Sequence, residues 1–195
     1  MPELSDTQLM YSGLGIAAAL LILIVAIWRW RVGRSLKKRL EQCGIELLSN
    51  ILIPNGEGGE IHVEHVLLTR TGVVVIETKD VEGNVFGSDS MQDWTVISDK
   101  RRFTFSNPQT AFYDRVAAVR RLLPDVPVKG YIAFLPKAEF TKGRPSDVIE
   151  FEAMLDELHK DNKSATTDSV DAFYAHWSKL RDEAVATQVG QLLKD

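Results

Sequence analysis

Two apolar stretches separated by turn-forming residues form the clearest pattern in the first half of the chain. Residues 61–69 alternate between apolar and polar positions before becoming apolar, and residues 73–76 are a run of β-branched side chains. Alternation with a period of two is typical of a strand, and a β-branched run is typical of a strand buried on both faces. Arg70, Thr71 and Gly72 read as a turn between them. The pattern predicts a β-hairpin.

The position of the turn decides which polar residues of the hairpin share a face. With Thr71 and Gly72 as a two-residue turn, Glu64 lies opposite Lys79. Opposed residues share a face, and so do Glu77 and Lys79, which are two positions apart on one strand, so the three side chains should converge. Two carboxylates beside a lysine are the groups that a metal-dependent phosphodiesterase needs. An edge hairpin with a surface ion pair would give the same pattern.

The rest of the chain alternates between short strand patterns and amphipathic helix patterns. A helix is expected at residues 35–48, and it would carry Glu46. The elements expected after the hairpin are a bent third strand at 83–87 and 94–97, a strand at 102–105, a helix at 109–123, a strand at 129–135, a short strand at 147–151, a helix at 152–160 and a last helix from Val170. This order indicates an α/β fold.

A longer apolar segment lies near the start of the chain. Residues 11–28 are apolar apart from Tyr11 and Ser12, and about 17 to 25 such residues can span a bilayer as a helix. Residues 1–8 hold two acids and no Lys or Arg, which argues against a cleaved signal peptide, and a buried core helix is the other alternative. Because the segment at 29–39 is basic, we expect a single-pass protein of a bacterial-type inner membrane, with its N-terminus outside and its soluble part cytoplasmic.

Charge is distributed unevenly along the chain. The formal net charge of -4 argues against a generally basic nucleic-acid-binding protein. Residues 100–144 nevertheless contain ten Lys and Arg against three Asp and Glu. This segment is either a phosphate-facing surface or scattered solvated charge. Cys43 is the only cysteine of the chain, which excludes an intrachain disulfide and a cysteine-rich zinc site.

Several spaced motifs occur between residues 44 and 123. They read Gly44-Ile45-Glu46, Val63-Glu64-His65, Glu77-Thr78-Lys79, Gly83-Asn84-Val85-Phe86-Gly87, Trp94 and Asn107-Pro108. In this order they resemble the nuclease-related domain (NERD) family, a branch of the PD-(D/E)xK restriction-endonuclease-like superfamily. The resemblance implies a restriction-endonuclease-like α/β core, in which helices flank a mixed central sheet.

The resemblance also implies an activity, namely hydrolysis of phosphodiester bonds in DNA with Mg²⁺, or alternatively Mn²⁺, as the cofactor. Glu64 and Glu77 would bind the metal with help from the Thr78 carbonyl. Lys79 would orient or deprotonate the attacking water, and Glu46 would hold a metal-bound water. The expected contacts to nucleic acid, with DNA as the substrate, are Asn107, Gln109, Arg101, Arg102 and Arg115.

Two positions depart from the family pattern. Glu64 stands where the family usually has Asp, and Ala111 stands where the family usually has Gln, three residues after Pro108. The longer carboxylate alters where a metal would be placed. These departures favour an alternative, a catalytically weak or inactive nuclease-like module that binds nucleic acid or a protein partner at the cytoplasmic membrane face. A structural domain whose Glu and Lys residues pair internally is a third interpretation.

The expected domain organisation follows from these patterns. A core and a mostly helical extension should follow the membrane segment. The expected parts are a short N-terminal segment at 1–10, a transmembrane helix at 11–28, a basic juxtamembrane segment at 29–39, a NERD core at 40–145 and a C-terminal extension at 146–195.

Overall fold

The structure is a computed structural model that describes residue 23, residues 35–164 and residues 168–192. The chain divides into two compact units, Met1–Arg39 and Leu40–Asp195. The second unit contains the two sheets and the helices that position the candidate site.

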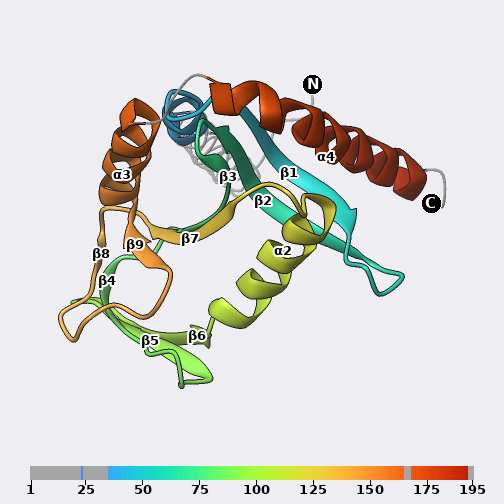
Figure 1. The fold of residues 1–195 in the computed structure, drawn as a ribbon. Helices are drawn as coiled ribbons and strands as arrows, with labels where there is room; N and C mark the ends of the chain where they lie inside the picture. Colours follow the sequence, from blue (N-terminus) through green and yellow to red (C-terminus); the bar gives the residue numbers. More distant parts are fainter. Residues whose placement is uncertain (1–22, 24–34, 165–167, 193–195) are drawn as a thin grey trace, which may run out of the picture. The chain divides into compact units, whose positions relative to one another are not determined.

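A five-stranded sheet forms the centre of this unit (Figure 1). Its strands, in spatial order, are β1 (Glu46–Pro54), β2 (Glu60–Thr69), β3 (Gly72–Lys79), β7 (Val128–Phe134) and β9 (Val148–Glu150). The first three strands pair antiparallel, whereas β3, β7 and β9 run parallel to one another. The carboxyl ends of three neighbouring strands therefore meet at one edge of the sheet.

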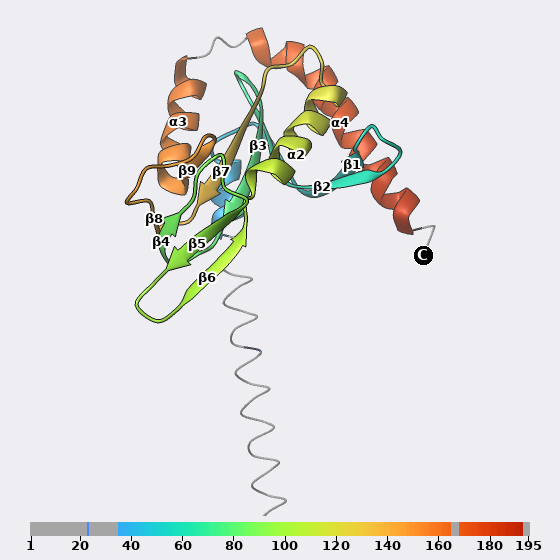
Figure 2. The same cartoon turned by 90° about the horizontal axis from the view of Figure 1, so that it is seen from below.

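A smaller four-stranded sheet lies beyond this edge (Figure 2). Its strands, in spatial order, are β6 (Arg102–Ser106), β5 (Asp93–Ile97), β4 (Gly83–Phe86) and β8 (Ala138–Glu139). Strand β4 follows β3 and β8 follows β7 after short breaks, and β4 and β8 again pair in parallel. The pairing of β3 with β7 thus continues into the small sheet, and the break separates the two sheets.

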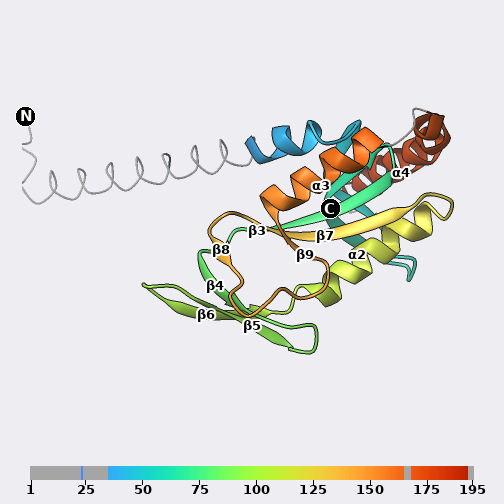
Figure 3. The ribbon, with the colours of Figure 1, turned by 60° about the vertical axis from the view of Figure 1, so that its left-hand side comes forward.

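Helices cover both faces of the large sheet. They are α2 (Gln109–Leu122), α3 (Phe151–Ser164) and α4 (Asp168–Leu192). Figure 3 shows α2 and α3 on opposite sides of β3 and β7. On one face Phe112 of α2 and Trp177 of α4 join a core cluster with Val66 and Val73. Alternate strand residues such as Leu67 are buried on the other face, as the period of two requires.

The expected fold class needs a correction. It placed a transmembrane helix at residues 11–28, but no helix in the described part of the chain is long and apolar enough to cross a membrane. Helices α2 and α3 have 14 residues each, and α4 carries charged residues within its 25. Except for Leu23, the expected span lies outside the described residues, as do residues 1–10 and 29–34. The chain has a mixed α/β fold in which helices flank the sheets.

The expected helix at 35–48 is wrong in its second half. Residues 35–41 are helical, but β1 begins at Glu46 and pairs along its length with β2. Ile51 and Ile53, two positions apart, are 5% and 0% exposed in this strand. Burial with a period of two against β2 therefore outweighs the helical spacing of the preceding residues.

Most later elements are where the sequence predicts them. The helix expected at 109–123 is α2, and the strands expected at 102–105 and 129–135 are β6 and β7. The bent third strand is instead two separate strands, β4 and β5, which pair antiparallel with each other. In the expected C-terminal extension, β9 pairs with β7 and α4 packs on β1, so this segment takes part in the large sheet.

Candidate functional site

The β2–β3 hairpin carries the acidic candidates, and its turn lies one residue earlier than expected. Thr69 pairs with Gly72, so Arg70 and Thr71 form the turn. The Thr69 hydroxyl closes it by donating to the Gly72 carbonyl at 2.9 Å and accepting from the Thr71 amide at 3.2 Å. The expected turn at Thr71 and Gly72 is wrong because these side-chain bonds favour the earlier position.

The corrected register still places the carboxylates on one face. Compared with the expected register, the partner of each residue on the opposite strand is shifted by two positions. Because side chains alternate with a period of two, each residue keeps its predicted face. The ladder ends at His65 and Ile76. One further step puts Glu64 opposite Glu77, rather than opposite Lys79, and paired Cβ atoms in such positions lie about 5 Å apart. Alternation along the strands thus assigns Glu64 and Glu77 to the same face, but the Glu64 carboxylate turns to the amide and hydroxyl of Thr78, beyond the last paired residues.

The end of β3 lies at the edge of the sheet where the carboxyl ends of the parallel strands meet. Glu77 and Lys79 end β3, beside the ends of the parallel strands β7 and β9. In open α/β sheets, ligands bind outside the carboxyl ends of the strands. Glu77 is only 8% exposed, and a carboxylate so deeply buried needs a counter-charge.

Two cations provide that counter-charge. Lys79 Nζ lies 2.6 Å from Glu77 Oε1, and Arg115 Nη1 lies 3.1 Å from Glu77 Oε2. Arg115 Nε also donates to the carbonyl of His62 at 2.9 Å, which ties α2 to β2. The side chains of Lys79 and Arg115 are 28% and 25% exposed, so solvent reaches both cations. Arg115, expected as a nucleic-acid contact, is thus a direct partner of Glu77.

The second carboxylate is held by Thr78. Glu64 Oε2 accepts a hydrogen bond from the Thr78 amide at 2.9 Å, and Glu64 Oε1 accepts one from the Thr78 hydroxyl. His65 Nε2 lies 3.6 Å from the same Oε1. The structure therefore brings Glu64, Glu77, Thr78 and Lys79 together, and these contacts fix the orientation of the Glu64 carboxylate.

The donor chemistry of this group suits a hard divalent cation. Mg²⁺ usually takes one or two carboxylates and keeps several waters, and Glu64 and Glu77 supply two carboxylates on neighbouring strands. Within the described ranges, no group of three or more His, Cys, Asp and Glu side chains is placed to hold a metal. A cation here would thus depend on water and substrate for its remaining ligands, and it would displace contacts that the carboxylates now make.

Glu46 lies elsewhere in the fold. It begins β1 opposite Leu68, four positions along β2 from Glu64, which corresponds to about 14 Å at ~3.4 Å per residue. The Tyr174 hydroxyl donates to Glu46 Oε1 at 2.9 Å, and the Trp177 indole N–H donates to Oε2. The expected position on a helix is wrong, and the carboxylate fastens α4 to β1.

The other expected nucleic-acid contacts fall into two groups. Arg101 and Arg102 are exposed at the β5–β6 hairpin, where the Arg101 guanidinium lies 5.1 Å from the ring centre of Phe103. Asn107 and Gln109 have internal partners instead, since Asn107 Nδ2 donates to a backbone carbonyl at 2.9 Å and Gln109 is 3% exposed. Both side chains of the first group are exposed, whereas Asn107 is half-buried and Gln109 is buried.

Gln109 is the centre of a clamp that sequence reasoning missed. Its Nε2 donates to Asp89 Oδ1 at 2.8 Å and to the Ser146 carbonyl at 2.9 Å. Ser146 in turn donates through its hydroxyl to Asp89 Oδ2 at 2.7 Å. The hydrogen bond from Gln109, followed by those from Ser146, holds the pKa of Asp89 below its ordinary value. The clamp joins the β4–β5 loop, the start of α2 and the β8–β9 loop.

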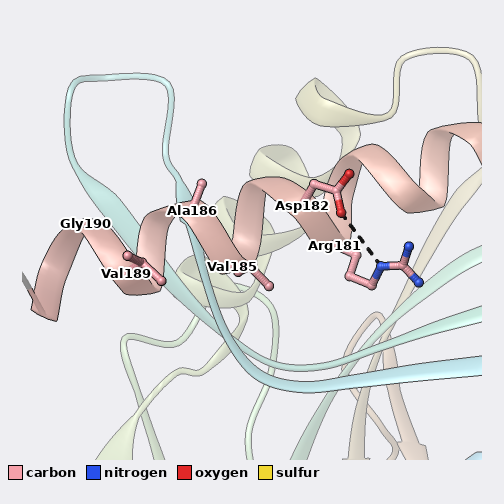
Figure 4. A pocket seen from close by; sticks show the side chains of 6 residues that line it. All are labelled: Arg181, Asp182, Val185, Ala186, Val189 and Gly190. Carbon is pink, nitrogen blue, oxygen red and sulfur yellow. Dashed lines mark ion pairs between the residues drawn. The ribbon is translucent and has the colours of Figure 1, made fainter.

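An open groove of about 600 Å³ runs beside the C-terminal half of α4 (Figure 4). Val185 and Val189, which line it, are 55% and 49% exposed. Figure 4 shows the Arg181–Asp182 ion pair at one end of this stretch. None of the expected site residues lines the groove, so the carboxylate group at the end of β3 remains the candidate site.

Comparison with known proteins assigns the chain to a family by its sequence. An uncharacterized protein of Bacillus anthracis is 28% identical over 120 residues, which cover 59% of this chain and 57% of that protein. The chain therefore spans little more than half the length of this relative. No solved structure gives a significant match. A model of the nuclease-related domain family matches residues 26–135, which is more than half of the chain. The chain belongs to the nuclease-related domain family.

Proposed function

We propose that the chain is a metal-dependent nuclease that hydrolyses phosphodiester bonds in DNA. The observation that carries the proposal is the pairing of Glu77 with Lys79 and of Glu64 with Thr78 at the carboxyl end of β3, in a member of the nuclease-related domain family. Glu64 and Glu77 would hold Mg²⁺, or Mn²⁺ in its place, and the Thr78 carbonyl would be a further ligand.

Each residue of the site has a separate task in this proposal. A bound Mg²⁺ would polarise the phosphodiester and activate a water molecule. The Lys79 ammonium would orient the attacking water and offset the negative charge that grows on the phosphate oxygens. Glu77 holds this ammonium at 2.6 Å. The Thr78 amide and hydroxyl keep the Glu64 carboxylate in one orientation until a cation competes for its oxygens.

One observation favours a second function. Both oxygens of Glu77 already contact cations, and both oxygens of Glu64 already accept hydrogen bonds. A site satisfied in this way is stable without a metal. The second candidate is therefore a catalytically weak or inactive nuclease-like module that binds nucleic acid or a protein partner.

A cleavage assay on the full chain separates the two functions. Linear and circular DNA, and RNA, are incubated with the protein and either Mg²⁺ or Mn²⁺. Lys79→Ala should reduce cleavage by at least about 100-fold, because it removes the charge beside the developing negative charge. Lys129→Ala is the matched control, since Lys129 is an exposed lysine that pairs with Asp161 at 2.8 Å and is absent from the site.

The possible results assign the function clearly. Cleavage that is lost in Lys79→Ala and kept in Lys129→Ala supports the nuclease. If the wild-type chain cuts no nucleic acid with either metal but still retards DNA in a gel-shift experiment, the chain acts as the nucleic-acid-binding module. Equal cleavage by the wild type and Lys79→Ala would contradict the proposed role of the lysine.

A further inference from the structure

Arg115 differs from the other basic residues of α2 in what it contacts. Arg120 and Arg121 each donate to a backbone carbonyl, whereas Arg115 reaches a buried carboxylate of the candidate site at 3.1 Å. Its Nε is fixed at 2.9 Å from the His62 carbonyl. Because the guanidinium is planar and rigid, Nε and Nη1 move together, so a turn that takes Nη1 away from Glu77 also opens the bond to His62.

The charges of the site balance only without a metal. Glu64 and Glu77 carry two negative charges, and Lys79 and Arg115 carry two positive ones. A divalent cation between the carboxylates would leave an excess of two positive charges. A phosphodiester carries one negative charge, and its pentavalent transition state carries more, so bound nucleic acid would remove this excess.

The two cations on Glu77 are not equally free to leave it. Lys79 lies on the same strand, two residues away, and has the shorter contact, 2.6 Å against 3.1 Å. Arg115 comes from a different element, α2, so its side chain can turn away from Glu77 without any change in β3. A guanidinium also matches two phosphate oxygens at once, which an ammonium does not. Arg115 is the cation that gives way to a metal at Oε2.

We infer that Arg115 is a phosphate-binding residue that Glu77 holds in reserve. Without a divalent cation the guanidinium neutralises Glu77 Oε2. When that oxygen ligates the cation, the guanidinium turns away from Glu77, gives up the His62 carbonyl, which lies at the exposed start of β2, and binds a phosphate of the nucleic acid. Arg115 thereby links loading of the metal to binding of the substrate, and the inference rests on the metal site of the proposed function.

Two measurements on the full chain test the inference, and neither depends on cleavage. The first is calorimetric titration with Mn²⁺ of the wild type, Arg115→Gln and the matched control Arg120→Gln. Arg115→Gln should bind Mn²⁺ about fivefold more tightly, because a competing ion pair of about 1 kcal/mol is gone. Arg120→Gln should bind as the wild type does, since the Arg120 guanidinium donates to the Val128 carbonyl at 3.0 Å, away from Glu77.

The second measurement is the salt dependence of binding to a short labelled DNA duplex, with and without Ca²⁺ and with the duplex checked for cleavage. With Ca²⁺, Arg115→Gln should show a slope of log affinity against log salt that is smaller by about 0.9, the value of one phosphate contact. Without divalent cation the slopes of wild type and variant should agree. A loss caused by misfolding would change both conditions, and circular dichroism monitors it directly.

The outcomes separate failure of the inference from failure of the proposed function. Mn²⁺ affinity that is unchanged or weaker in Arg115→Gln overturns the inference, as does a slope difference of the same size with and without Ca²⁺. Absence of any Mn²⁺ binding by the wild type overturns the metal site itself, and the inference falls with it. Tighter metal binding together with a slope change confined to Ca²⁺ supports the inference.

Discussion

Glu46→Ala should weaken the fold and leave the chemistry of the site intact. The carboxylate of Glu46 accepts hydrogen bonds from Tyr174 and from the fully buried Trp177, and it lies 3.8 Å from Arg181. The family resemblance implies instead that Glu46 holds a metal-bound water. The substitution therefore distinguishes an anchor for α4 from a catalytic residue.

The size of the effect follows from the exposure of each partner. The indole N–H of Trp177 has no access to water, so leaving it unpaired costs about 1–3 kcal/mol. Tyr174 is 40% exposed, and water can replace its lost acceptor at little cost. The Arg181 side chain is 42% exposed, and such a pair contributes about 0–1 kcal/mol. We expect a loss of about 2 kcal/mol in the free energy of unfolding.

Urea unfolding followed by circular dichroism measures this loss. A double-mutant cycle with Trp177→Phe isolates the indole contact, because without the indole donor Glu46→Ala should cost less than about 1 kcal/mol. Mn²⁺ affinity of the folded variant should equal that of the wild type. The reasoning is refuted if the stability of Glu46→Ala is within about 0.5 kcal/mol of the wild type, or if the folded variant loses metal binding.

Three smaller predictions concern other parts of the fold. Gly130→Ala should cost about 1–3 kcal/mol in urea unfolding, because a Cβ there would lie 2.7 Å from a phenylalanine ring, whereas Gly190→Ala, in a helix with open space, should gain about 0.5–1 kcal/mol. The bond from Gln109 holds the pKa of Asp89 below 3.8, so thermal stability should fall as acid lowers the pH through that depressed pKa, and Asp89→Asn should lack this loss. Burial raises the pKa of Tyr131, and the neighbouring Glu157 raises it further. In an ultraviolet titration, Tyr131→Phe should therefore lack the tyrosine ionisation that occurs at the highest pH.

The hairpin shows what periodicity can and cannot predict. Its strands and the shared face of Glu64 and Glu77 follow from alternation with a period of two, which survives an error in the turn. The turn itself depends on the hydroxyl of Thr69, whose two bonds no pattern of apolar residues reveals. Gly72, expected in the turn, instead begins β3 with a φ of 137°, a conformation that favours glycine.

Contacts between distant segments explain what sequence reasoning missed. Strand β1 has an apolar pattern that resembles the preceding helix, and only its pairing with β2 decides its conformation. The ion pair of Arg115 with Glu77 joins residues 38 positions apart. Its prediction would require knowing how the chain crosses from β3 to β7 and which side of α2 meets the sheet. Burial of Gln109 likewise depends on two loops far from it in sequence.

The parallel pairing of β3 with β7 also bears on the order in which the chain folds. Strands β1, β2 and β3 are joined by short turns, whereas residues 80–127 separate β3 from β7. Closing a long loop costs more entropy, so we expect the antiparallel strands to pair first and β7 to join later. Arg115 reaches Glu77 only after α2 has docked on this sheet. The Glu77 carboxylate therefore lacks one of its two counter-charges until a late stage of folding. A partly folded chain does not yet have a complete site.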